Sequence, residues 1–230
     1  MMLPLIQETP LPQARAPFHF NSAAHLMLIG RERATNLQEL LEALRNCPDD
    51  SIFQHTFRTL QEHHFIRQGF SNDFALWAVD ECQEVSLGEK LASLDVREFT
   101  SIGDLRRRIV QIVEDHLKHN SLAASRPARK PFYFCGSDTV VLPTAFVAAN
   151  LKEFAEALKH VTIHSIHYHF IEARLRLKLR SNDFSVWLDE DLGLPRAAAL
   201  LNSIDIYTST LEGVRRKIVR IVESVILKAS

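Results

Sequence analysis

The sequence predicts a mainly α-helical protein, an internal duplication of a helical unit of about 100 residues. A short extended segment at the start of each copy is compatible with this prediction. Five blocks predict the duplication because they recur in the same order, always 109 to 114 residues apart. The blocks are FHF at 18–20 with FYF at 132–134, NLQELLEAL at 36–44 with NLKEFAEAL at 150–158, SIFQH at 51–55 with SIHYH at 165–169, SNDFALW at 71–77 with SNDFSVW at 181–187, and LRRRIVQIVE at 105–114 with VRRKIVRIVE at 214–223.

The matched blocks divide the chain into two domains. A polar stretch with two prolines, HNSLAASRPARKP, separates the copies and is typical of a linker. A proline-containing segment precedes the first copy. We therefore predict a loose leader at 1–17, a helical repeat domain at 18–118, a linker at 119–131 and a second helical repeat domain at 132–230.

The second pair of blocks predicts the first helix of each copy. Asn36 and Asn150 stand where an N-cap residue belongs, and Glu39 and Glu153 follow three residues later, as in a capping box. Apolar residues then recur at i, i+3, i+4 and i+7, the spacing of an amphipathic helix. They are Leu37, Leu40, Leu41 and Leu44 in one copy, and Leu151, Phe154, Ala155 and Leu158 in the other.

Two further helices are predicted in each copy. The SND triplets precede Phe74 with Trp77 and Phe184 with Trp187, pairs that share one helix face. The last blocks each predict a longer amphipathic helix. Its apolar residues are Leu105, Ile109, Ile112, Val113 and Leu117, and Val214, Ile218, Ile221, Val222 and Ile226.

The start of each copy has mixed signals. FYFC with TVVLP at 139–143 favours a strand, whereas AHLMLI at 24–29 suits a strand or a buried helix. RLRLKLR at 174–180 alternates as a strand does, but its counterpart at 60–66 does not, so we favour a helix there.

Composition and motifs exclude several classes of protein. A net charge of −1 gives the whole chain no electrostatic preference for nucleic acid or anionic membrane. Three distant cysteines without a CxxC pair argue against a disulfide framework and favour a reducing cytoplasm. Dinucleotide, P-loop, hydrolase and EF-hand motifs are absent from the sequence. The acidic pairs Glu81 with Glu84 and Asp189 with Asp191 are interpreted as solvated helix ends.

Three histidines fall within six residues of a helix predicted over 163–178. At ~100° per residue, His164 and His167 lie close together, while His169 points to nearly the opposite side. A metal pair formed by His164 and His167 would need ligands from elsewhere. In the first copy only His55 is retained, as the counterpart of His169. We expect His55 and His169 to lie at the edge of the core, bonded to a carboxylate or a carbonyl. Metal ligation and a catalytic or ligand-binding role are the alternatives.

Arginines open the last block of each copy. Arg106 and Arg215 fall within the apolar stripe, and an unpaired buried charge costs several kcal/mol, so both need partners. We predict that they pair with matched carboxylates and tie two helices together, or line a pocket for an anionic ligand. These carboxylates are Asp73 and Asp183, Glu39 and Glu153, and Asp95 and Asp205.

The second copy resembles an uncharacterised family of bacterial and archaeal domains of unknown function. The resemblance covers much of 132–226, and the first copy matches more weakly, with Gln54, Thr56 and Arg58 at three of the positions. It implies no activity, cofactor or partner. The residues that carry it are Ser165, Ile166, Tyr168, His169, Phe170, Glu172, Arg174, Asn182, Asp183, Phe184 and Trp187.

These observations favour a cytoplasmic, non-enzymatic binding module without a cofactor. Its partner would be a protein or a small ligand held between the copies, and a homodimer is one arrangement. One alternative is a metal-dependent or ligand-processing enzyme that uses His164, His167, His169 and Glu172. Another is nucleic-acid binding through Arg107, Arg108, Arg216, Lys217 and Arg220. The candidate ligand or polar-network residues are His169, Glu172, Arg215, Asp183, His55, Arg106 and Asp73.

Overall fold

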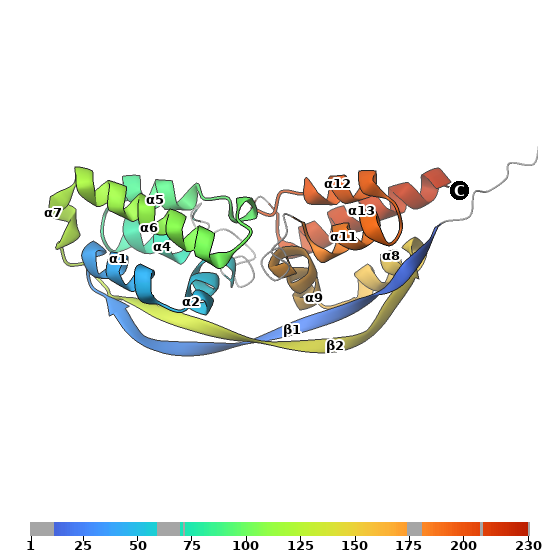
Figure 1. Cartoon of the computed structure of the whole chain (residues 1–230), viewed down its shortest axis with the longest axis horizontal. Coiled ribbons are helices and arrows are strands. Elements are labelled where there is room, and N and C mark those ends of the chain that lie inside the picture. The colour runs from blue at the N-terminus through green and yellow to red at the C-terminus, as the bar shows by residue number, and fades with distance from the viewer. Residues whose placement is uncertain (1–11, 59–69, 71, 174–180, 208, 230) are drawn as a thin grey trace, which may run out of the picture. The chain divides into compact units, whose positions relative to one another are not determined.

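The computed structural model describes residues 12–58, 70, 72–173, 181–207 and 209–229, and it has a mixed α/β fold (Figure 1). Two long strands, β1 (Gln13–Ala34) and β2 (Phe132–Asn150), pair in an antiparallel two-stranded sheet. The sheet makes the fold mixed α/β rather than mainly α, and the extended segments are much longer than the short ones expected. β1 also takes in the end of the segment predicted as a leader.

The described residues form two compact units. Unit 1 comprises 12–23, 141–173 and 181–229, and unit 2 comprises 24–140. Each strand thus contributes one half to each unit. Each unit contains nearly the same helices as one of the two predicted domains. The strands are divided differently, because the first part of β1 belongs to the same unit as the helices that follow β2.

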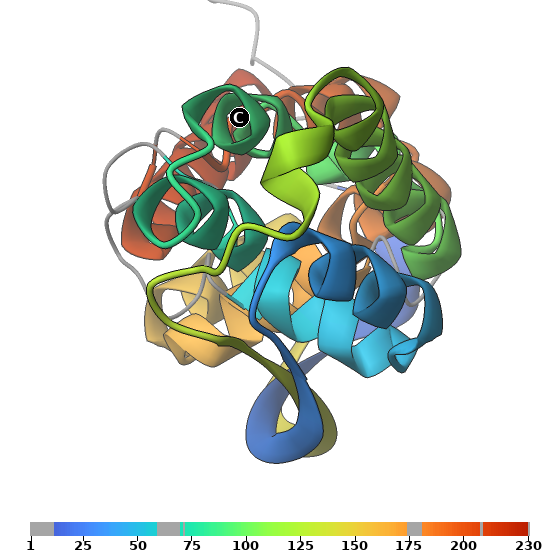
Figure 2. The same cartoon turned by 90° about the vertical axis from the view of Figure 1, so that its left-hand side faces the viewer.

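Unit 2 begins with the second half of β1 and continues into helices. In Figures 1 and 2, α1 and α2 lie nearer to the strands than α6 does. The segment predicted as a linker includes a short helix, α7. The elements are α1 (Leu37–Asn46), α2 (Asp49–Phe53), the π-helix η1 (Gln54–Arg58), α4 (Asp73–Asp80), α5 (Val85–Ala92), the 3₁₀-helix η3 (Val96–Glu98), α6 (Ile102–His119) and α7 (Ser121–Ala124).

Unit 1 contains corresponding elements in the same order. The helix predicted over 163–178 is regular only up to His167, because it continues as a π-helix. Residues 174–180 and 60–66, for which a strand and a helix were weighed, lie outside the described residues. The elements are α8 (Leu151–His160), α9 (Ile163–His167), the π-helix η4 (Tyr168–Glu172), α11 (Asp183–Glu190), α12 (Pro195–Asn202) and α13 (Leu211–Ala229).

The predicted helix starts are confirmed. Asn36 Oδ1 accepts the backbone N–H of Glu39 at 2.9 Å, and Asn150 Oδ1 accepts that of Glu153 at 3.0 Å. The glutamates depart from the capping box, since each accepts the backbone N–H of the residue before the N-cap, Thr35 for Glu39 and Ala149 for Glu153. The asparagines of the two SND triplets likewise cap α4 and α11. The first backbone N–H groups of a helix have no acceptor within the helix, so side chains that accept from them determine where the helix begins.

Aromatic side chains form the core beside the strands in each unit. In unit 1, Phe18 of β1 lies 5.5 Å from Phe154 and 5.4 Å from Phe184, measured between ring centroids. In unit 2, Phe132 of β2 lies 5.2 Å from Phe74. FHF of β1 thus packs on helices that follow β2, and FYF of β2 packs on helices that follow β1. These edge-on, tilted and stacked ring contacts add to the stabilisation from burial.

Among the described residues, every helix is too short or too polar to cross a bilayer.

Candidate functional site

A histidine–aspartate pair recurs at the same place in both units. His55 Nδ1 lies 2.9 Å from Asp73 Oδ2 in unit 2, and His169 Nδ1 lies 2.7 Å from Asp183 Oδ2 in unit 1. Each histidine is buried and lies on a π-helix, while each aspartate is the first residue of an α-helix further along the chain. The pair therefore ties together two helices that are separated along the chain.

The other ring nitrogen of each histidine binds a strand. The backbone N–H of Cys135 donates to His55 Nε2 at 3.0 Å, and that of Asn21 donates to His169 Nε2 at 2.8 Å. A backbone N–H can only donate, so Nε2 must be unprotonated and Nδ1 carries the proton toward the carboxylate. Both nitrogens then have protein partners. This arrangement joins strand, π-helix and α-helix, and it leaves neither nitrogen open for a metal ion.

Unit 1 has a second buried histidine–carboxylate pair. His167 Nδ1 lies 2.9 Å from Glu172 Oε1, and both side chains are buried. His164 is exposed, so the three clustered histidines face different surroundings. No group of three metal-ligating side chains converges within the described ranges. The sequence positions matched to this pair hold Phe53 and Arg58 in unit 2.

Unit 2 has a polar network of its own, which the sequence analysis missed. His116 Nε2 lies 3.0 Å from Glu84 Oε2, and Arg126 Nη1 donates to Glu84 Oε1 at 2.9 Å. The interpretation of Glu84 as a solvated helix end is wrong because its side chain is buried. Leu194 and Val225 of unit 1 occupy the positions of Glu84 and His116. Apolar residues at both matched positions were the sequence signal that Glu84 and His116 lie in the core.

Both predicted core arginines bind the C-terminal end of a helix. Arg106 Nη1 donates to the carbonyl oxygens of Leu44 and Cys47, and Nη2 pairs with Asp49 at 2.6 Å. Cations at this end complement the helix dipole and its orphan carbonyls. The predicted pairing with a carboxylate matched between the copies is therefore wrong for Arg106.

Arg215 is similar in unit 1. Its Nη1 donates to the carbonyl oxygens of Leu158 and Lys159, and its Nε lies 3.0 Å from Glu212 Oε2. Its predicted partners are wrong as well. Arg215 also lines a hollow of about 280 Å³ with Lys159, Arg216 and Arg220.

Three of the other basic residues of α6 and α13 have local partners. Arg107 pairs with Asp104, Arg108 donates to Gln111, and Lys217 donates to Ser209 Oγ at 2.6 Å. Nucleic-acid binding through these residues stays a prediction.

Two of the cysteines are unsuited to nucleophilic chemistry. Burial raises the pKa of Cys47 to about 11 and the pKa of Cys82 to about 12. Since the thiolate is the reactive form, these thiols stay protonated and inert near neutral pH.

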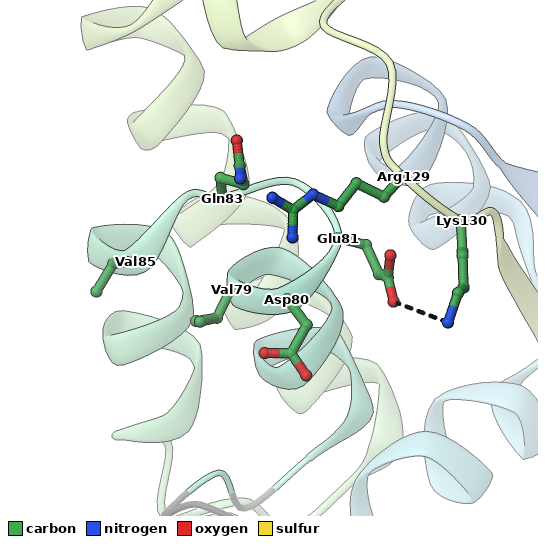
Figure 3. A pocket seen from close by; sticks show the side chains of 7 residues that line it. All are labelled: Val79, Asp80, Glu81, Gln83, Val85, Arg129 and Lys130. Atoms are coloured by element: carbon green, nitrogen blue, oxygen red, sulfur yellow. Dashed lines mark ion pairs between the residues drawn. The ribbon is translucent and has the colours of Figure 1, made fainter.

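A surface hollow of about 600 Å³ lies beside the turn between α4 and α5 (Figure 3). Asp80 and Glu81 line it together with Arg129 and Lys130, and the Glu81 carboxylate lies 4.0 Å from Lys130 Nζ. Gln83 borders it in a left-handed conformation, with φ of 61°. The charges balance and the polar side chains are mostly exposed, so the hollow has no preference for a ligand of either charge.

Comparison with known proteins assigns the chain to a family. The solved structure of OrfY from Thermoproteus tenax superimposes with a TM-score of 0.82 at 32% sequence identity, over 92% of this chain and 96% of that one. No curated protein matches. A model of the family of unknown function DUF5752 matches residues 15–223, and the chain therefore belongs to that family.

Proposed function

We propose that the chain is a non-enzymatic protein-interaction module, whose interaction surface is the apolar segment Leu26–Ile29 of β1. The exposed fractions of Leu26, Met27, Leu28 and Ile29 are 57, 53, 49 and 83%. Successive side chains of a strand point to opposite faces. Both faces of the strand are therefore apolar and uncovered here, and this observation carries the proposal.

Such a surface is costly for an isolated protein. Four consecutive large apolar side chains of this segment are exposed to water. Each strand of a two-stranded sheet also has an outer edge, where backbone N–H and C=O groups have no strand partner among the described elements. A partner that covers the apolar side chains and adds a strand at this edge removes both costs.

The partner that these features fit is a second copy of the same chain. Leu26–Ile29 contains no charged residue, so two copies of the segment meet without like-charge repulsion. Each copy supplies the same apolar side chains and the same open edge. The resulting interface is isologous, as in most homodimers.

The proposal includes the internal duplication predicted from the sequence. The corresponding elements of the two units, their matched N-caps and their matched histidine–aspartate pairs support it. In this interpretation one half of each strand completes the other copy.

Sedimentation equilibrium over a range of concentrations tests the second-copy partner. We expect a reversible dimer, and a variant with both Leu26→Lys and Met27→Lys should weaken dimerisation at least tenfold, or about 1.4 kcal/mol. Leu122→Lys is the matched control, because Leu122 is 82% exposed but lies on α7. A wild-type chain that stays monomeric, or a control that weakens the dimer equally, would contradict the proposal.

A further inference from the structure

A pocket of about 320 Å³ lies in unit 2 between the two strands and the start of α2. Leu28, Ile29 and Phe134 form an apolar wall, and Asp50 and Ser51 supply the polar groups. The volume falls at the lower end of the range for small-ligand sites. A mostly apolar lining with a few convergent polar atoms is typical of such sites.

The polar groups of this pocket have acceptor atoms without a donor. Asp50 Oδ1 and Ser51 Oγ are buried and make no hydrogen bond with any of the described residues. The Ser51 side chain belongs to a residue only 3% exposed, so it is fixed within the protein. Buried polar atoms are nearly always paired, so these two unpaired oxygens of the pocket lining call for a hydrogen-bond partner.

A glycine keeps the space around the carboxylate open. A Cβ atom at Gly136 would lie 2.5 Å from Asp50 Oδ2, too close for any other residue without a shift. The charged residues around the pocket are Asp50, Glu32 and Arg31, which together carry a net negative charge. The site therefore favours a positively charged donor.

The equivalent place in unit 1 is occupied by side chains. Gly136 corresponds to Ser22 and Pro48 to Thr162, and the hydroxyl oxygens of Ser22 and Thr162 lie 3.2 Å apart. Asp50 corresponds to His164, so the carboxylate is absent there. The open acidic pocket is a property of unit 2 alone within the described parts of the chain.

We propose that this pocket binds a primary alkylammonium group. The nitrogen would donate to Asp50 and Ser51, and the alkyl chain would lie along Leu28, Ile29 and Phe134. An ammonium has three donors and no acceptor, so it can donate both to the Asp50 carboxylate and to a lone pair of the Ser51 hydroxyl oxygen. The same chemistry is present in a free alkylamine and in a lysine side chain of a peptide.

Titrations followed by ¹H–¹⁵N spectra of the full chain test the proposal, with hexylammonium chloride as the probe and hexanol as its uncharged counterpart. We expect saturable shifts at unit 2 residues with hexylammonium and at least tenfold weaker binding of hexanol. A short apolar peptide with a central lysine forms a second arm. Tighter binding of the peptide than of hexylammonium identifies a lysine side chain as the source, and the reverse order identifies a free amine.

Variants separate the site from the fold. Asp50→Asn should weaken hexylammonium binding at least tenfold, and Ser51→Ala should weaken it less, while both keep the thermal midpoint of unfolding. The matched control is His164→Asn, the corresponding position in unit 1, which should bind as the wild type does. Equal binding of hexanol, unchanged binding by both pocket variants, or the absence of saturable shifts would overturn the proposal. If Asp50→Asn does not fold, Ser51→Ala decides in the same assay.

Leu28 and Ile29 belong both to the wall of this pocket and to the proposed dimer surface, so an alkylammonium ligand and a second copy of the chain would compete for them. Leu26 and Met27, the positions changed in the dimer test, do not line the pocket. Because their double variant should be monomeric, it should bind hexylammonium at least as tightly as the wild type does if the pocket proposal is correct.

Discussion

The two units have the same framework but different polar residues around it. In both, a buried histidine joins an aspartate at a helix start to a backbone N–H of a strand. Beyond this pair they diverge. Unit 1 adds His167 with Glu172, whereas unit 2 adds Glu84 with His116 and keeps an open pocket at Asp50. The shared pair therefore explains how each unit is assembled, and the residues that differ are where distinct binding properties can reside.

The largest effect is expected from removing the shared histidine. His55→Ala or His169→Ala leaves an aspartate and a strand N–H without the ring that joins them, and each variant should lower the free energy of unfolding by about 3 kcal/mol. Urea unfolding followed by circular dichroism measures the loss. Similar losses in both variants would support equivalent roles.

The control for this comparison is His164→Ala, since His164 is exposed and should change stability by less than about 0.5 kcal/mol. If only one of the two buried histidines proves necessary, the pair is structural in one unit and has another role in the other.

A smaller effect is expected at the network found only in unit 2. Glu84→Leu introduces the residue of unit 1 but leaves His116 buried without its carboxylate, at a cost of about 2 kcal/mol. Adding His116→Val, again the residue of unit 1, should recover most of that loss, because an apolar pair replaces a polar one of similar volume. Urea denaturation of the two variants gives both values.

A double variant less stable than Glu84→Leu alone would contradict this interpretation. It would mean that His116 stabilises unit 2 through contacts other than Glu84.

The helices were predictable from the sequence because their signals are local. Asn36 and Asn72, together with their counterparts in the second copy, cap helices through residues only three positions away. His55 and His169 could be singled out as candidates because they occupy matched positions in the blocks SIFQH and SIHYH. The predictions that depend on neighbouring residues, such as the N-caps, are therefore confirmed.

The sequence could not show which helices each strand would join. A strand extends ~3.3 Å per residue, so a long continuous strand carries Phe18 away from the helices that follow Ala34. The length of β1 was hidden because AHLMLI lacks the alternation of a half-buried strand, and its exposed side chains explain that absence. The partners of Arg106 were missed for a different reason: they are mainly backbone carbonyls, which residue identities do not encode.

The smallest effect is expected at a turn whose backbone is the same in both units. Gln83 has φ of 61° and its counterpart Gly193 has φ of 66°. Residues other than glycine pay a steric cost in this left-handed region, but glycine loses more conformational entropy on folding. We expect Gln83→Gly to raise the free energy of unfolding by only about 0.5 kcal/mol and Gly193→Ala to lower it by about 1 kcal/mol. Thermal unfolding of both variants measures the difference. If Gln83→Gly is instead destabilising, the glutamine side chain stabilises the turn by more than the backbone conformation costs. The turn of unit 2 would then be held by interactions that unit 1 does not need.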